Sequence, residues 1–194
     1  MPKDFSFNVT PPNKLQRAEY ACDDDWIRNF FLQAEVGHVA TSWDEQPFIT
    51  PILFWYDPQH HEIYFHTNIT GRLRANIERQ DKVCIEASRV GHALPANTAL
   101  EFALQYESAV AFGRGRLISD DDEKRRTLYG LIEKYFPKMT AGVHYRPITD
   151  QELKRTAVYA IAIESWSGKR NWPARAKQLP DWPPLGDEWF EEDN

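Results

Sequence analysis

Cysteine is scarce in this sequence, which has two cysteines among 194 residues, Cys22 and Cys84. Two isolated cysteines form no disulfide framework and no metal-binding pair, and they are typical of reduced thiols in the cytoplasm. The chain also lacks an apolar run of about 18 residues, as a membrane span requires, and the N-terminus shows no signal-peptide pattern. Its net charge of −6 gives no basic surface for nucleic acid. We therefore expect a cytoplasmic protein with no membrane or nucleic-acid partner.

Common catalytic motifs are missing as well. The sequence contains no G-x-S-x-G, no phosphate-binding loop and no G-x-G-x-x-G, which argues against a serine hydrolase, a nucleotide triphosphatase and a Rossmann-type cofactor site. The pair His60-His61 has no third ligand at metal-binding spacing, so we expect no metal site. The sequence shows neither a strong nucleophile nor a set of metal ligands, so the catalytic residues stay unknown. We expect a bound cofactor to supply the chemistry.

Aromatic residues, in contrast, are abundant, at 13% of the chain with seven tryptophans. A hydrophobic content of 42% and this length are sufficient for one domain with a sizeable core. The residue pattern divides the chain into an N-terminal arm at residues 1–20, a folded domain at 21–172 and a tail at 173–194. The tail is rich in proline and tryptophan and ends in acidic residues, so it cannot hold a core alone.

The pattern predicts about six strands, mostly antiparallel, and two or three helices besides short pieces. The strands are expected at residues 37–43, 47–56, 62–67, 82–88, 106–118 and 157–166. A first helix is expected from Cys22–Asp25 to a stop at Gly37, and further helices at 71–79, 120–135 and 149–155. Residues 89–105 are interpreted as a loop with a short helical piece, and 167–172 as a polar turn. This order predicts a mainly β protein with flanking helices, whose antiparallel sheet closes into a barrel.

The long strand at 106–118 has small residues on one face, namely Ala109, Ala111, Gly113 and Gly115. Small side chains in a strand allow another backbone or a flat ligand to approach closely. Tight barrel packing explains the same pattern, and the two interpretations are compatible.

One turn has the features of an anion site. The strand at residues 62–67 runs into Thr70-Gly71-Arg72, where we expect Thr70 to cap the next helix. Free N–H groups and the helix dipole attract anions at a helix start, and Arg72 adds a planar fork for phosphate oxygens. His66 ends the strand beside this turn, where it either contacts a ligand or has a structural role.

The same region carries a family resemblance. The segments QPFITPILFWYD and IYFHTNITGRLRANIERQDKVCIEAS resemble motifs of the flavin-binding split barrels in the pyridoxamine 5′-phosphate oxidase-like superfamily, including its nitroimidazole-resistance-type branch. The counterparts are Gln46-Pro47, Thr67-Asn68, Gly71-Arg72 and Gln80–Val83. The resemblance covers residues 36–118 well and 156–172 loosely. It implies a six-stranded antiparallel FMN-binding split barrel that forms a homodimer with FMN at the subunit interface.

The resemblance also implies a set of FMN contacts. A strand backbone runs along the flavin ring, a polar turn holds the ribityl chain and phosphate, a polar residue on the long strand reaches the flavin across the dimer, and a C-terminal pair contacts the ring. In this sequence the corresponding positions are Thr50, Pro51, Ile52, Leu53, His66, Thr67, Gly71, Arg72, Leu73, Ser108, Lys169 and Trp172.

Two departures from the family pattern matter for function. Leu73 stands where many relatives have a second phosphate-binding lysine, and Thr50 stands where the vitamin B6 oxidases have an arginine. The segment 164–172 also lacks the histidine of the family's Arg-x-His substrate motif. We therefore expect Arg72 to dominate phosphate binding, helped by Arg74, Thr70 or Lys169, and we expect that pyridoxamine 5′-phosphate is not the substrate.

The sequence thus predicts an FMN-binding oxidoreductase for a small planar substrate such as a quinone or nitroaromatic compound. Two alternatives stay open. A haem-binding or haem-degrading split barrel would need His66, His92 or His144 to reach iron. A non-catalytic FMN carrier or regulatory dimer would need no substrate site at all.

Overall fold

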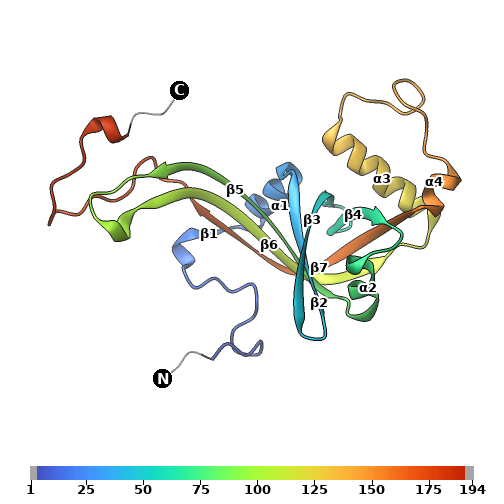
Figure 1. Ribbon diagram of the computed structural model, residues 1–194, viewed down its shortest axis with the longest axis horizontal. Helices are drawn as coiled ribbons and strands as arrows, with labels where there is room; N and C mark the ends of the chain where they lie inside the picture. The colour runs from blue at the N-terminus through green and yellow to red at the C-terminus, as the bar shows by residue number, and fades with distance from the viewer. Residues whose placement is uncertain (1–3, 191–194) are drawn as a thin grey trace.

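The computed structural model describes residues 4–190 and shows a seven-stranded antiparallel sheet with helices around it (Figure 1). Residues 1–3 of the predicted arm and the acidic end of the tail, residues 191–194, lie outside the described residues. The strands are β1 (Ala21–Cys22), β2 (Val36–Trp43), β3 (Gln46–Asp57), β4 (Glu62–Asn68), β5 (Lys82–Leu94), β6 (Ala103–Leu117) and β7 (Thr156–Asn171). The helices are α1 (Asp24–Gln33), α2 (Arg72–Arg79), α3 (Asp121–Tyr135) and α4 (Asp150–Lys154), with short 3₁₀ turns η1 (Ala18–Tyr20), η2 (Ala99–Glu101) and η3 (Asp187–Trp189).

Six of these strands close into a ring. The sheet order is β1-β7-β4-β3-β2-β5-β6, and an additional pairing between β6 and β7 closes the ring. The two-residue strand β1 lies outside the ring and pairs only with the last part of β7. This arrangement confirms the predicted mainly β, six-stranded antiparallel split barrel with flanking helices.

Strand alternation explains which side chains fill the barrel. On β6 the buried positions include Ala109 and Ala111, whereas Arg114 and Arg116 point outward into ion pairs. At Gly113 a Cβ atom would lie 2.0 Å from the carbonyl oxygen of Ala162 on β7, at a register shift between the two strands. The predicted stripe of small residues on this strand therefore serves close barrel packing.

Long strands extend from the barrel and form an arm, which reaches away from α3 and α4 in Figure 1. Here the sequence interpretation was wrong twice. Residues 89–105 are not mainly a loop, because β5 and β6 continue as a paired hairpin with an irregularity between Val90 and Ala93. Residues 167–171 are not a turn, because they continue β7 and pair with both β6 and β1. Long-range pairing satisfies the backbone there and overrides the local turn signals.

The predicted tail packs on this arm. The side chain of Asn97 donates hydrogen bonds to the carbonyl oxygens of Leu179 and Trp182, at 2.7 and 2.9 Å, and accepts one from the Leu179 N–H at 2.8 Å. Gln105 donates to the Pro173 carbonyl oxygen at 2.8 Å. The described part of the tail is therefore an ordered cover of the β5–β6 hairpin.

Two helix boundaries also differ from the prediction. Helix α1 starts as expected after Asp23, whose carboxylate accepts a hydrogen bond from the Trp26 N–H, but it ends at Gln33. Gly37 does not stop it and lies inside β2. Helix α2 starts after Gly71 rather than with a Thr70 cap. By contrast, the predicted capping box between Thr149 and Glu152 is confirmed at α4.

Helix α3 covers the outer face of β3 and β4. Gly130 of α3 sits directly on Trp55, and a Cβ there would lie 2.5 Å from the indole ring. Arg126 donates hydrogen bonds of 2.6 Å to the buried carboxylate of Asp57 and to the hydroxyl of Tyr64. Among residues 4–190, no helix has the length and apolar character needed to cross a membrane.

Candidate functional site

The site residues predicted on β3 lie where β3 and β4 separate. Pairing between these strands ends at Phe54 and Phe65, so the next positions, Leu53 and His66, stand at an opening. Leu53 is 53% exposed on the outer face of the barrel. Ile52 is buried in the core and can offer a ligand only its backbone. The exposed edge of β3 therefore presents backbone groups and apolar side chains, among them Ile49 and Leu53.

A polar hollow of about 460 Å³ opens below this edge, lined by His66, Thr67, Asn68, Ile69, Arg155 and Thr156. The structure brings the predicted residues His66 and Thr67 together here. Arg155 was missed by the sequence interpretation, because it follows α4 and is far from the motif in the chain. Its approach depends on the pairing of β4 with β7, which matches Asn68 with Thr156.

The start of α2 is open. Gly71 has a φ of 153°, no side chain caps the helix, and a Cβ built on Gly71 would meet nothing within 4 Å. The first N–H groups of the helix have no side-chain cap, and such groups can bind an anion. Leu73 is buried in the barrel core, so only its backbone N–H is available.

Arginines differ in their availability near this turn. Arg72 lies over the rings of Trp43 and Phe48, at 5.7 and 5.2 Å from their centroids. Among residues 4–190, neither Arg72 nor Arg155 forms an ion pair with an acidic side chain. Arg74, which was expected to assist phosphate binding, instead bonds to the Ile69 carbonyl oxygen and to Glu78. Arg72 and Arg155 are thus the cations free to meet an anionic ligand.

An apolar cavity of about 390 Å³ adjoins the polar hollow and shares His66 and Thr156 with it. Its walls are Leu53, Leu128, Leu131, Ile132, Tyr135, Phe136, Tyr145, Arg146, Ile148 and Glu152, together with the two shared residues. Burial by this surrounding protein lowers the pKa of His66. A lowered pKa favours the neutral imidazole, which can donate or accept a hydrogen bond.

The remaining predicted contacts lie elsewhere in the chain. Ser108 on β6 faces Lys169 on β7 across the arm, and Lys169 lies near the rings of Tyr20 and Tyr106. Trp172 packs against Gly91 at the arm. The part of β7 that pairs with β4 ends at Ala162, well before Lys169, and none of these three residues lines the hollows beside Leu53 and His66 within one chain.

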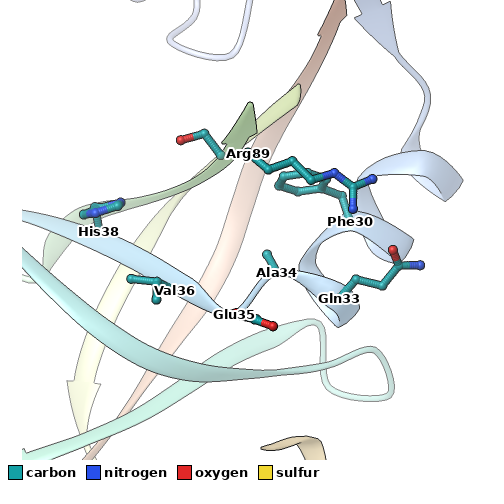
Figure 2. A pocket seen from close by; sticks show the side chains of 8 residues that line it. Phe30, Gln33, Ala34, Glu35, Val36, His38 and Arg89 are labelled. Carbon is teal, nitrogen blue, oxygen red and sulfur yellow. The ribbon is translucent and has the colours of Figure 1, made fainter. Parts of the chain in front are cut away.

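A third cavity of about 390 Å³ opens where β2 and β5 separate beyond the pair of His38 and Glu86. Figure 2 shows its lining, with the guanidinium of Arg89 beside the ring of Phe30 and His38 on the opposite side. Arg89 is already bound to the buried carboxylate of Glu107, which also pairs with Arg170 at 2.8 Å. No group of three or more potential metal ligands is present among residues 4–190.

Comparison with protein families gives one match. A family described as pyridoxamine 5′-phosphate oxidase matches residues 23–170 of the chain. The match includes every element of the barrel and all of the predicted site positions except Trp172. A search of curated proteins finds no match.

Several solved structures share the fold. The flavocytochrome Anf3 from Azotobacter vinelandii is 26% identical with a TM-score of 0.74, over 91% of this chain and 77% of that one. An FAD- and haem-binding protein from Mycobacterium smegmatis is 24% identical with a TM-score of 0.71, over 87% and 77% of the two chains. A candidate 5-nitroimidazole antibiotic resistance protein from Bacteroides thetaiotaomicron is 24% identical with a TM-score of 0.65, over 77% and 85%.

Proposed function

Since the chain belongs to the pyridoxamine 5′-phosphate oxidase family, we propose that it is a flavin-binding oxidoreductase with FMN as its cofactor. The observation that carries the proposal is the open, uncapped start of α2 next to the exposed edge of β3. A phosphate fits the first site, and a flat ring fits the second. The two ends of FMN differ in the same way, one anionic and one planar and largely apolar.

The residues present suit such a group. Arg72, Arg155 and the N–H groups at the start of α2 would hold the phosphate, and Thr67 would hydrogen-bond the ribityl chain. The backbone of β3 from Thr50 to Leu53 would support the ring. The bound flavin would supply the redox chemistry, while the protein orients the ring and excludes water from one face.

We also propose a homodimer, because part of the predicted contact set is out of reach in one chain. Ser108, Lys169 and Trp172 lie on the arm, away from Leu53 and His66. An arm from a second copy would bring these residues to the other face of the ring. We keep the cytoplasm as the proposed location, since Cys22 and Cys84 are both free thiols.

Haem is the second candidate cofactor, alone or beside the flavin. Two of the similar structures are described as a flavocytochrome and as an FAD- and haem-binding protein. His66 borders an apolar cavity and has a lowered pKa, and a neutral imidazole is the form that ligates iron. His144 and His92 do not line this cavity.

The test is the absorbance spectrum of the purified protein, followed by mass spectrometry of the released cofactor. A flavin spectrum with the mass of FMN is expected. The mass of FAD would correct the cofactor but keep the flavin, and a Soret band would favour haem at His66. A colourless protein that takes up neither flavin nor haem in a titration would overturn the proposal.

A further inference from the structure

One exposed apolar surface lies on the segment between α3 and α4. This segment, residues 136–149, leaves the end of α3 and folds back along the helix toward α4. It exposes Phe136, Met139 and Val143, of which Val143 is 76% exposed, and we call these three residues the return surface. A group of exposed apolar side chains on an ordered segment is typical of an interaction site, whereas a single one is not.

Hydrogen bonds fix the backbone of the 136–149 segment. The N–H of Gly142 donates to the carbonyl oxygen of Tyr145 at 2.7 Å, which closes a tight turn. The N–H of Ile148 donates to the hydroxyl of Tyr129 on α3 at 3.1 Å. The return surface is therefore preformed, and a partner that docks on it has little chain to order.

A second exposed apolar surface lies at the tip of the arm. Leu100 in the 3₁₀ turn η2 is 97% exposed, and Phe102, which follows this turn, is also exposed. Trp182 of the tail is exposed as well, and Asn97 holds it near the tip by donating a 2.9 Å hydrogen bond to its carbonyl oxygen. We call Leu100, Phe102 and Trp182 the tip surface.

The two surfaces lie at opposite ends of the molecule. Figure 1 shows the arm reaching away from α3 and α4 along the longest axis, with η2 in its outer part. The tip surface of a chain therefore cannot cover the return surface of the same chain. Each surface stays exposed unless a second molecule covers it.

The charges beside the two surfaces are opposite. The segment 136–149 carries basic residues, Lys138 among them, and no acidic residue. The tip carries Glu101 and Asp181, and the end of the hairpin at 94–104 contains no basic residue. Within residues 4–190, none of these three charged side chains forms an ion pair. Opposite charges beside two apolar surfaces favour their association and set its orientation.

We propose that the tip surface of one chain docks on the return surface of a second copy of this chain. The contact rests on the proposed homodimer, in which the arm carries Ser108 and Lys169 to the flavin site of the partner subunit. Two-fold symmetry repeats the contact, so each chain gives one tip and receives one, and the assembly closes as a dimer.

The length of the arm fits this contact. Phe102 precedes Ser108 by six residues, which span about 20 Å in an extended strand. Leu53 and Phe136 line the same cavity, so the return surface begins close to the edge that would support the flavin ring. An arm that places Ser108 at this edge of the partner therefore has enough length beyond it to bring the tip surface onto the partner's return surface.

Cross-linking of the purified protein with a carbodiimide tests the contact, because this reagent joins an amine to a carboxylate only where the two groups touch. Lys138 is the only lysine in the 136–149 segment, so its links are unambiguous. Links from Lys138 to Glu101 or Asp181 are expected in the covalent dimer separated on a denaturing gel, and not in the monomer band. Lys138→Gln should remove these links and is the matched control.

Dissociation of the dimer gives the energetic test, measured by sedimentation over a dilution series. Leu100→Ser should raise the dissociation constant at least about tenfold, because a leucine that becomes buried on docking contributes through its apolar area. Val143→Ser should act in the same direction, and the double variant should lose less than the two single losses combined, since both residues belong to one contact. Leu32→Ser on α1 is the control, because Leu32 is exposed and belongs to neither surface. Thermal unfolding checks that every variant is folded.

Three results would overturn the proposal. A covalent dimer without links between Lys138 and the tip, or an unchanged dissociation constant for folded Leu100→Ser, removes the tip contact but keeps the proposed homodimer. A monomeric wild-type protein removes both. Flavin titration is read separately, so a protein that binds FMN and fails here loses only the contact between the tip surface and the return surface.

Discussion

The ammonium group of Lys134 donates a 2.9 Å hydrogen bond to the carbonyl oxygen of Phe54. The same group bonds to the carbonyl oxygen of Ala34 at 2.7 Å, just after α1. Lys134 thereby ties the end of α3 to both α1 and the part of β3 that precedes the opening at Leu53. It has no acidic hydrogen-bond partner among residues 4–190, and burial lowers its pKa from 10.5 to about 8.

This lysine predicts a distinctive dependence of stability on pH. Between pH 8 and 10.5 the unfolded chain binds more protons at Lys134 than the folded one, so the contribution of this group to stability rises with pH. Relative to Lys134→Met, the wild-type free energy of unfolding should increase by about 1–2 kcal/mol from pH 8 to 9.5. Urea unfolding of both proteins at the two pH values measures this, and a constant difference would contradict the lowered pKa.

Arg72→Ala should weaken FMN binding by about 1.5–3 kcal/mol, because a charge-assisted contact to phosphate is lost. Arg79→Ala is the matched control, since Arg79 lies at the other end of α2 and pairs with Asp44. Titration of the apoprotein with FMN and with riboflavin gives the readout. The affinity for FMN should fall when Arg72 is lost, whereas the affinity for riboflavin should not change. An unchanged FMN affinity would refute the phosphate assignment.

Glu107→Gln should destabilise the fold by about 3–5 kcal/mol, because it removes the charge that two arginines share at a buried site. Glu107 is 3% exposed, and Arg89 and Arg170 bind it from the neighbouring strands. Denaturant unfolding at pH 7 measures the loss, with Glu133→Gln as an exposed control. A change in the free energy of unfolding below about 1 kcal/mol would show that the ion pairs of Glu107 with Arg89 and Arg170 contribute as little as surface ion pairs.

A homodimer is expected by light scattering at micromolar concentration, since obligate interfaces commonly bury about 2,000 Å² or more. Mixed dimers test whether the arm acts on the partner's site. A mixed dimer combines one Arg72→Ala subunit with one Lys169→Ala subunit. If Lys169 contacts the flavin of the other subunit, one of the two flavin sites in this dimer keeps both residues. If both residues serve the same subunit's site, mixing restores no FMN affinity, and a monomer with bound FMN would exclude the interface altogether.

Pyridoxamine 5′-phosphate should not be oxidised with saturable turnover when the FMN-loaded protein is supplied with it under air. The basic groups that a second phosphate would need are already committed. Arg146 pairs with Glu152, Arg170 pairs with Glu107, and Lys169 lies near two tyrosine rings. Assays of peroxide and pyridoxal 5′-phosphate provide the measurement, and robust production of both would show the prediction to be wrong.

Local patterns in the sequence were sufficient for most of the barrel. A run of β-branched and aromatic residues predicted the strand around Phe54, and alternation predicted the strand around Ile63, because inward side chains in a closed sheet are apolar at every second position. The turn at Gly71 and Arg72 was also visible, since glycine and a following basic helix start form a short-range signal. These features depend on neighbours in the chain, which a sequence displays directly.

Tertiary structure alone decided the rest. Residues 89–105 and 167–171 carry turn signals, yet pairing between distant strands makes them an extended arm. Arg155 reaches the polar hollow beside His66 only because β7 pairs with β4, and Tyr145 reaches the apolar cavity only because the 136–149 segment returns along α3. The sequence by itself determined which residues can bind a phosphate and an aromatic ring. Which of them meet depended on strand register and long-range packing, which no local pattern contains.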